Sequence, residues 1–150
     1  LEDVMRKSAD GVDLFVLDEA VAAGNHGLIE EATLIDFLRG SEAAGALLRG
    51  TIERGELIYG SALTRIELSI GTRAKERRAT DALTGAISWL TVDDRVAEQA
   101  DAFARRYGRG HSGIDAVDYC IAATAHVHGL ELWTLNVRHF PMFTGLRPPW

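Results

Sequence analysis

The sequence predicts a single α/β domain built around a mainly parallel sheet. Short apolar strands alternate with helical stretches from about residue 33 onward, and strands separated by helices pair in parallel through crossover connections. The chain has 150 residues, 47% of them hydrophobic, so it fits one domain with a sizeable core. Oxygen-bearing side chains follow several of the expected strands, at the edge where open α/β sheets bind ligands.

Periodicity and end signals assign the elements in chain order. We expect helices at 33–39 and 79–90, a helix capped by Ser41 that runs to Arg49, and a helix that begins over 64–70. Asp93 or Asp94 caps a helix that ends near Tyr107, and Ser112 opens a helix that ends at Gly129. Strands are expected at 56–61, 90–92 and 130–134, and the Pro-rich tail is irregular.

The first 32 residues are less regular than the rest. The run DLFVLD at 13–18 is the best strand candidate there, since a bounded apolar run suits a buried parallel strand. Residues 1–9 fit a short helix, and residues 19–32 contain Gly24, Asn25 and Gly27, which are typical of a loop. We therefore expect one domain over 1–150 in which 1–32 is atypical, as an N-terminal appendage or an insertion.

Composition narrows the functional classes. The net charge of −6 argues against holding nucleic acid by bulk electrostatics, but acids gathered in one site can bind cations that then meet a phosphate. The single Cys120 excludes an internal disulfide framework and a cysteine zinc cluster. No apolar run approaches the roughly 20 residues of a membrane span, and no secretory signal is visible. The reducing cytoplasm is the expected location.

Two acids lie together on the helix expected after Ser112. At about 100° per residue, Asp118 falls within the apolar arc that holds Ile114 and Ile121, and Asp115 lies about 60° away. A bare buried charge is costly, so Asp118 should be neutralised, paired or bound to metal. A capping box from Ser112 to Asp115 is an equally good explanation of Asp115. A cap does not explain Asp118, for which an ion pair with an arginine is the main alternative.

Three further oxygen ligands follow expected strands. Glu67 comes after the strand at 56–61, Asp18 ends the strand at 13–18, and Asn136 follows the strand at 130–134. A capping box from Thr64 explains Glu67 if that residue is taken alone. Together these groups predict an oxygen-rich site for Mg²⁺ or Mn²⁺, which prefer carboxylates and water.

The remaining candidates are weaker. His139 lies near Asn136, where a phosphate contact is conceivable but a structural role in the turn before Pro141 fits better. The basic residues between the expected helices are typical of a solvated face, although they could steer RNA; they are Arg73, Lys75, Arg77 and Arg78. The sequence contains no phosphate-binding glycine loop and no serine nucleophile elbow.

Three segments resemble one known family. TLIDFLRGSEAAGALL, SALTRIELSIG and HSGIDAVDYCIAATAHVHGLELWTLNVRHFPMFTGL are similar to PIN-domain toxins of the VapC type, over about residues 33–150. The resemblance implies a PIN fold, which is a Rossmann-like three-layer sandwich, and Mg²⁺- or Mn²⁺-dependent endoribonuclease activity. It also implies a partner antitoxin and a homodimer. Glu67 and Asp118 match acidic site positions, Asp115 matches an additional acid, and Asn136 stands where many relatives carry Asp.

The first acid of the family pattern is ambiguous in this sequence. Relatives have a strand that runs into a pattern like V-D-T-N-V-L-I-D, and a gapless match places Glu30 at the Asp position. An insertion of about a dozen residues would instead place Asp18 there, after a stronger strand, and we favour Asp18 on that ground. A third interpretation is that the first 28 or so residues are foreign to the domain.

These residues predict metal-assisted hydrolysis of RNA phosphodiesters. Asp18 or Glu30 would hold one or two cations with Glu67 and Asp118, and Asp115 and Asn136 would assist directly or through water. If Glu30 is the first acid, its extra methylene shifts the carboxylate by about 1 Å and weak activity follows. Two alternatives stay open: an impaired domain that only binds RNA or protein, and a phosphatase-like hydrolase that uses Asp18 as a nucleophile.

Overall fold

The central sheet has four parallel strands. The computed structural model describes residues 26–150; the predicted helix at 1–9, the predicted strand at 13–18 and Asp18 lie outside the described residues. The strands are β1 (Gly27–Ile29), β2 (Ile58–Ser61), β3 (Ser88–Leu90) and β4 (Glu131–Trp133), in the order β3-β2-β1-β4. β1 is therefore central, and it pairs with β2 on one side and with β4 on the other.

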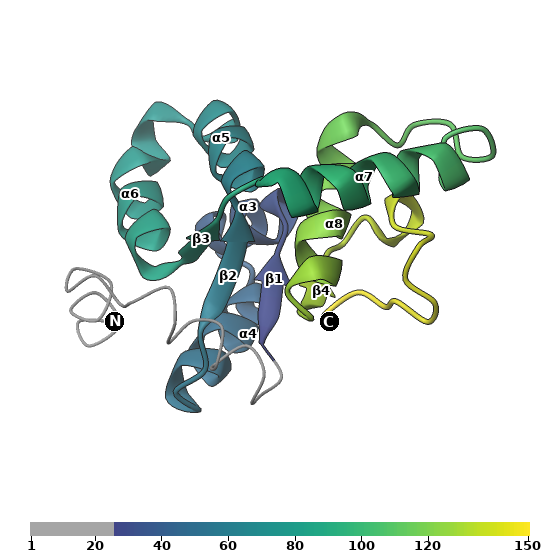
Figure 1. The fold of residues 1–150 in the computed structure, drawn as a ribbon. Helices are drawn as coiled ribbons and strands as arrows, with labels where there is room; N and C mark the ends of the chain where they lie inside the picture. The colour runs from purple at the N-terminus through teal and green to yellow at the C-terminus, as the bar shows by residue number, and fades with distance from the viewer. Residues whose placement is uncertain (1–25) are drawn as a thin grey trace.

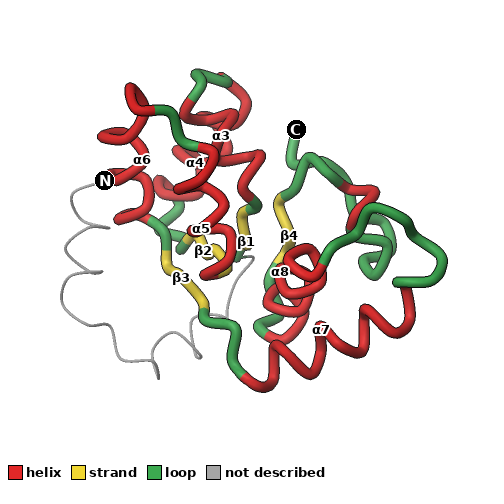
Figure 2. The backbone as a smooth tube through the Cα atoms, turned by 90° about the horizontal axis from the view of Figure 1, so that it is seen from above, coloured by secondary structure: helices red, strands yellow, loops and turns green. Residues whose placement is uncertain are grey.

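Helices cover both faces of the sheet and complete three layers. On one side lie α3 (Glu31–Leu38), α4 (Glu42–Glu53), α5 (Ala62–Gly71) and α6 (Arg77–Ala86), with the 3₁₀ turn η1 (Ala74–Glu76) between the last two. On the other side lie α7 (Asp94–Tyr107) and α8 (Ala116–Val127) (Figures 1 and 2). A second 3₁₀ turn, η2 (Val137–His139), follows β4. This arrangement confirms the α/β sandwich with a parallel sheet.

Alternation along the strands builds a separate core on each face. Leu28 belongs to a buried cluster with Ile121 of α8, whereas its neighbour Ile29 belongs to a cluster with Leu34 of α3 and Leu68 of α5. This is the period-two pattern of a strand covered on both faces. Gly27 has no side chain because a Cβ there would overlap the Trp133 indole.

The structure corrects several predicted boundaries, and the helix capped by Ser41 ends at Glu53 rather than Arg49. Residues 27–29, expected in a loop, form the central strand β1, because β2 and β4 supply ladder partners on both sides. The helix expected at 79–90 ends at Ala86, so β3 begins at Ser88 rather than residue 90. The predicted caps at Ser41 and Asp93 are confirmed, since each side chain accepts a backbone N–H of its helix.

Two predicted capping boxes were wrong. Ser61 caps α5 through Leu63 N–H, which leaves Thr64 buried inside the helix. Asp115 rather than Ser112 caps α8. In both cases the helix begins at a different residue from the one that the Ser/Thr-x-x-acid pattern indicated. Within residues 26–150, no helix is long and apolar enough to cross a membrane.

Candidate active site

The carboxyl ends of the strands bring the predicted acids to one edge of the sheet. Glu30 directly follows β1 and is the N-cap of α3. Glu67 lies in α5, the helix that begins immediately after β2. Thr134 and Asn136 follow β4, and α8 begins beside this edge with Asp115 as its N-cap. Parallel strands thus deliver residues that are far apart in sequence to one place.

Glu30 is buried and held by the residue that follows β4. The residue is only 9% exposed, and the Thr134 hydroxyl donates to Glu30 Oε2 at 3.0 Å. The same hydroxyl accepts the Asn136 backbone N–H at 2.9 Å. Burial raises the pKa of Glu30, and the negative charges of Glu31 and Asp118 raise it further, while the Thr134 bond lowers it.

Asp115 and Asp118 cap the first turn of α8 reciprocally. Asp115 Oδ1 accepts the backbone N–H groups of Val117 at 2.8 Å and Asp118 at 3.0 Å. Asp118 Oδ2 in turn accepts the Asp115 N–H at 3.1 Å. Asp118 is therefore part of the helix cap. The sequence analysis had excluded this role, because it expected the helix to begin at Ser112.

Asp118 is also paired, although with a histidine rather than the expected arginine. His139 Nδ1 lies 3.0 Å from Asp118 Oδ2, and the Asp118 side chain is 15% exposed. Burial raises the pKa of Asp118. The backbone bond from Asp115 and the neighbouring His139 act in the opposite direction, and the charge of Asp115 raises the pKa further.

Glu67 is half-buried and has no hydrogen bond or ion pair with another residue in 26–150. Burial is the largest cause that raises its pKa, which reaches about 7 from the ordinary 4.5. The negative charges of Glu31 and Glu30 add to this, followed by those of Asp115 and Asp118. Glu67 therefore lies where negative charge is in excess, which is the condition that a bound cation relieves.

A common pattern unites the three acids that are hydrogen-bonded. Glu30, Asp115 and Asp118 each have one carboxylate oxygen that accepts protein donors. Within the part of the chain that the structure describes, the other oxygen of each carboxylate has no hydrogen-bond donor. The protein thus fixes one oxygen of each acid and leaves one for a ligand.

This donor set fits a hard divalent cation in its chemistry. Carboxylate oxygens are what Mg²⁺ and Mn²⁺ prefer, and the pKa of Glu67 is raised first by burial and then by the negative charges around it. As they stand, no three Asp, Glu, His or Cys side chains among residues 26–150 converge closely enough to hold one ion. Binding therefore requires side-chain rotation, which is easiest for Glu67 because it has no partner to lose among these residues.

The structure brings together most of the predicted site. Glu67, Asp115, Asp118 and Asn136 lie at the same edge of the sheet, together with Glu30, the alternative first acid. Asp18, which we favoured for that position, lies outside the described residues, so its role stays a prediction.

The sequence analysis missed the roles of three residues. Thr134 holds Glu30, and His139 holds Asp118. Glu31 adds a charge beside α5, where its carboxylate lies close to Gly71. The position of Thr134 directly after an apolar strand was the signal that could have found it, whereas the contact between His139 and Asp118 spans 21 residues and has no local signature.

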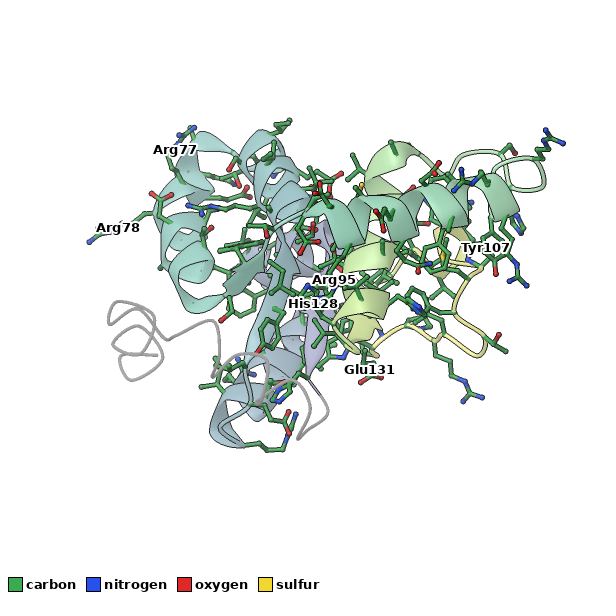
Figure 3. All side chains as sticks on the ribbon, viewed as in Figure 1. Arg77, Arg78, Arg95, Tyr107, His128 and Glu131 are labelled. Atoms are coloured by element: carbon green, nitrogen blue, oxygen red, sulfur yellow. The ribbon has the colours of Figure 1, made fainter. Side chains whose placement is uncertain are left out.

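The predicted basic residues lie on a different flank. Arg73, Lys75, Arg77 and Arg78 are all exposed on η1 and α6, and Figure 3 shows Arg77 and Arg78 on the outer side of α6, far from Tyr107 of α7. Arg73 and Lys75 line a hollow of about 480 Å³ with Arg39. We call Arg73, Lys75, Arg77 and Arg78 the basic flank.

Sheet order, layers and strand-end acids together define a PIN domain, and the chain belongs to the PIN-domain family, whose profile matches residues 32–141. The chain is 47% identical over 123 residues to Ribonuclease VapC19 of Mycobacterium tuberculosis, which covers 82% of this chain and 98% of that protein. It is 41% identical over 122 residues to Ribonuclease VapC10 of the same bacterium, with coverage of 81% and 91%.

A solved structure is similar over nearly its whole length. A toxin–antitoxin complex from Klebsiella pneumoniae contains a chain that matches with a TM-score of 0.68 at 26% identity, over 83% of this chain and 98% of that one. The predicted resemblance to VapC-type PIN proteins is thereby confirmed. The family profile begins at residue 32, two positions after Glu30, so it does not decide between Glu30 and Asp18.

Proposed function

We propose that this protein is a divalent-metal-dependent endoribonuclease and the toxin of a toxin–antitoxin module, acting in the cytoplasm. Its relatives are named ribonucleases, and a similar solved structure is a toxin–antitoxin complex. The observation that carries the proposal is the set of carboxylates at one sheet edge, three of them with one oxygen held by the protein and one without a donor among the described residues. After rotation of the Glu67 side chain, such an arrangement would present carboxylate oxygens to a cation that contacts a phosphate.

Each acid has a distinct part in the proposed site. Glu30, Glu67 and Asp118 would hold Mg²⁺ or Mn²⁺, and Asp115 and Asn136 would assist directly or through water. Glu30 is our first choice for the initial acid because it follows the central strand and is fixed by Thr134. Asp18 stays the competing assignment, and a pair of variants decides between them below.

The protein's own residues orient the carboxylates of the site and shield them from water. A cation held by Glu30, Glu67 and Asp118 would supply polarisation of the phosphoryl oxygen and a lowered pKa for a bound water. Thr134 and the α8 capping box fix the rotamers of Glu30, Asp115 and Asp118. Burial of Glu30 and Asp118 lowers the local dielectric, which strengthens their attraction for a cation.

An antitoxin and a second copy of the chain are the proposed protein partners. The helices α3 and α4 are rich in Leu and Ala, but Leu34, Ile35 and Leu48 are buried in the core. Three large apolar residues in 26–150 are exposed: Ile66 at 56% and Ile70 at 80%, both on α5, and Trp150 at 42% in the tail. We propose α5 as the contact face of the homodimer. Light scattering of Ile70→Glu against the unmodified chain measures whether the dimer depends on that face.

The test of function is metal-dependent cleavage. The chelator-treated protein is incubated with end-labelled structured RNAs and no metal, then with Mg²⁺, Mn²⁺ or Ca²⁺. We expect internal cuts only with Mg²⁺ or Mn²⁺. Binding of RNA without cleavage at any metal concentration would favour the impaired, binding-only domain. Hydrolysis of a small phosphate ester with a trapped phospho-aspartate would favour the phosphatase-like alternative.

A further inference from the structure

His139 makes a directed contact with the proposed site from a separate element. It ends η2, after β4, whereas Asp118 lies in the first turn of α8. The two side chains are 23% and 15% exposed, and His139 Nδ1 lies 3.0 Å from Asp118 Oδ2. Where Asp118 is ionised, its carboxylate has only acceptor atoms, so the donor in this hydrogen bond is then His139 Nδ1.

With this contact, one oxygen of Asp118 takes part in two hydrogen bonds. Oδ2 already accepts the Asp115 backbone N–H at 3.1 Å, so it has two donors from two segments. Oδ1 has no donor among residues 26–150. Rotation of the carboxylate would break both bonds to Oδ2, and the direction of Oδ1 is therefore fixed.

The other side of the imidazole faces the loop that leads into α8. His139 Nε2 lies 4.0 Å from the position of a Cβ on Gly113, in the loop that leads into α8. Gly113 has a φ of +98°, a conformation that favours glycine. His139 Nε2 therefore lies on the side of the loop before Asp115, while Nδ1 lies at Asp118 Oδ2.

We propose that His139 is a positioning residue of the nuclease site: by holding Asp118 Oδ2, it directs Oδ1 toward the divalent cation. The inference rests on the proposed function, and it adds a role that the acids alone do not supply. Groups that hydrogen-bond a metal-ligating side chain orient it, and their loss costs about 10- to 100-fold in metal affinity or activity.

The test compares two substitutions of His139 whose side-chain amides differ in length. The amide nitrogen of His139→Asn falls near the position of Nδ1, whereas that of His139→Gln reaches toward the position of Nε2. His126→Ala is the matched control, since this exposed histidine of α8 packs on Phe103 instead of an acid. Mn²⁺ affinity is measured by calorimetry on chelator-treated protein without RNA, and kcat, KM and Tm are measured beside it.

We expect His139→Gln to weaken Mn²⁺ binding and lower kcat by about 10-fold or more, with KM for RNA little changed. His139→Asn should recover most of both losses, and His126→Ala should match the unmodified chain. Equal losses in the Asn and Gln variants, or unchanged Mn²⁺ affinity in both, would overturn the positioning role. A rise in KM alone would also overturn it, because the imidazole would then contact RNA.

The same experiment separates this inference from the proposed function. If the unmodified chain binds Mn²⁺ and cuts RNA while both His139 variants behave like it, only the positioning role fails. If the unmodified chain neither binds Mn²⁺ nor cuts RNA, the proposed function fails before His139 is considered. A fall in Tm that is equal in the Asn and Gln variants, with their Mn²⁺ affinities still different, supports positioning over a merely structural role.

Discussion

The acidic edge of the sheet and the basic flank carry opposite charges and are built in opposite ways. At the acidic edge, Glu30 and Asp118 are largely buried, and hydrogen bonds fix one oxygen of each. On the basic flank, Arg77 and Arg78 are exposed, and their side chains make no hydrogen bond or ion pair with other described residues. The acidic edge is therefore rigid and partly shielded from water, whereas the basic flank is exposed to solvent.

This difference shows why a net charge of −6 says little about what the protein binds. Chemistry on a phosphate needs groups that are held within a fraction of an ångström and shielded from water. Attraction of a polyanion needs only exposed positive charge, which acts at a distance and is screened by salt. We expect variants at the acidic edge to change kcat strongly and variants on the basic flank to change KM weakly.

The largest expected effect comes from Asp118→Asn. The change keeps the size of the side chain and an oxygen that can accept the Asp115 N–H, so the fold should survive. Loss of a group that only supports a ligand costs about 10- to 100-fold, so loss of the ligand itself should lower kcat by more than about 100-fold. Cleavage of labelled RNA measures this, with Asp101→Asn as control because the exposed Asp101 pairs with Arg105 of the same helix, α7. Unchanged cleavage by Asp118→Asn would remove this residue from the site.

A second pair of variants decides the first acid. Glu30→Gln keeps an acceptor for Thr134 but removes the charge at the end of the central strand, and we expect kcat to fall by about 100-fold. Asp18→Asn should leave cleavage within about twofold of the unmodified chain, since the order-of-magnitude cost applies only to a ligand or its support. If Asp18→Asn lowered cleavage more than Glu30→Gln, Asp18 would be the first acid of the site.

The third prediction concerns pH and follows from Glu67, whose pKa is raised to about 7. A cation binds the deprotonated carboxylate, so kcat/KM at subsaturating Mn²⁺ should fall by about tenfold per pH unit below pH 7. Glu67→Gln should lower the rate and flatten this profile. A wild-type profile with no change between pH 8 and pH 6 would contradict the assignment of Glu67.

The stability of the metal-free protein should change in the reverse direction. Between pH 4.5, the ordinary pKa, and about 7, the folded state binds the Glu67 proton more tightly than the unfolded state. The contribution of Glu67 to the free energy of unfolding is therefore full below pH 4.5 and is lost as the pH rises through 7. Urea unfolding at pH 5 and pH 7.5, with and without Glu67→Gln, isolates this contribution.

The smallest effect is expected on the basic flank. Reversing both charges in Arg77→Glu/Arg78→Glu should raise KM for RNA by several-fold and lower the slope of log affinity against log salt by about 1 per residue. The control is Arg105→Glu/Arg106→Glu, at the far end of α7. A similar rise in KM in both double variants would show that RNA does not bind preferentially to the basic flank. A fall in kcat for the α6 variant would break the separation between the two regions.

Local patterns were sufficient for the features that depend on one segment. The helical period placed Asp115 and Asp118 on one helix and one turn apart, and the strand-then-helix order placed Glu67 beyond β2. Ser41 and Asp93 were recognised as caps because a cap is a property of three or four consecutive residues. The errors at Thr64 and Ser112 have the same origin, because two residues within one turn can each satisfy the capping pattern.

The choice between Asp18 and Glu30 could not be settled this way. The segment at 13–18 has four adjacent apolar residues, and GLI at 27–29 has only two. Yet 27–29 forms the centre of the sheet, because β2 and β4 pair with it on both sides and two cores cover its faces. Burial by neighbours compensates for a weak intrinsic preference.

The sequence by itself determined the α/β layering, the parallel sheet and most of the acids, since these follow from hydrophobic period and from the order of elements along the chain. Tertiary structure alone decided that β1 begins at Gly27, that Thr134 holds Glu30, and that His139 holds Asp118. These contacts join residues 104 and 21 positions apart. Their geometry exists only after β4 and α8 have packed on β1, because hydrogen bonds depend on distance and direction, which no local sequence pattern encodes.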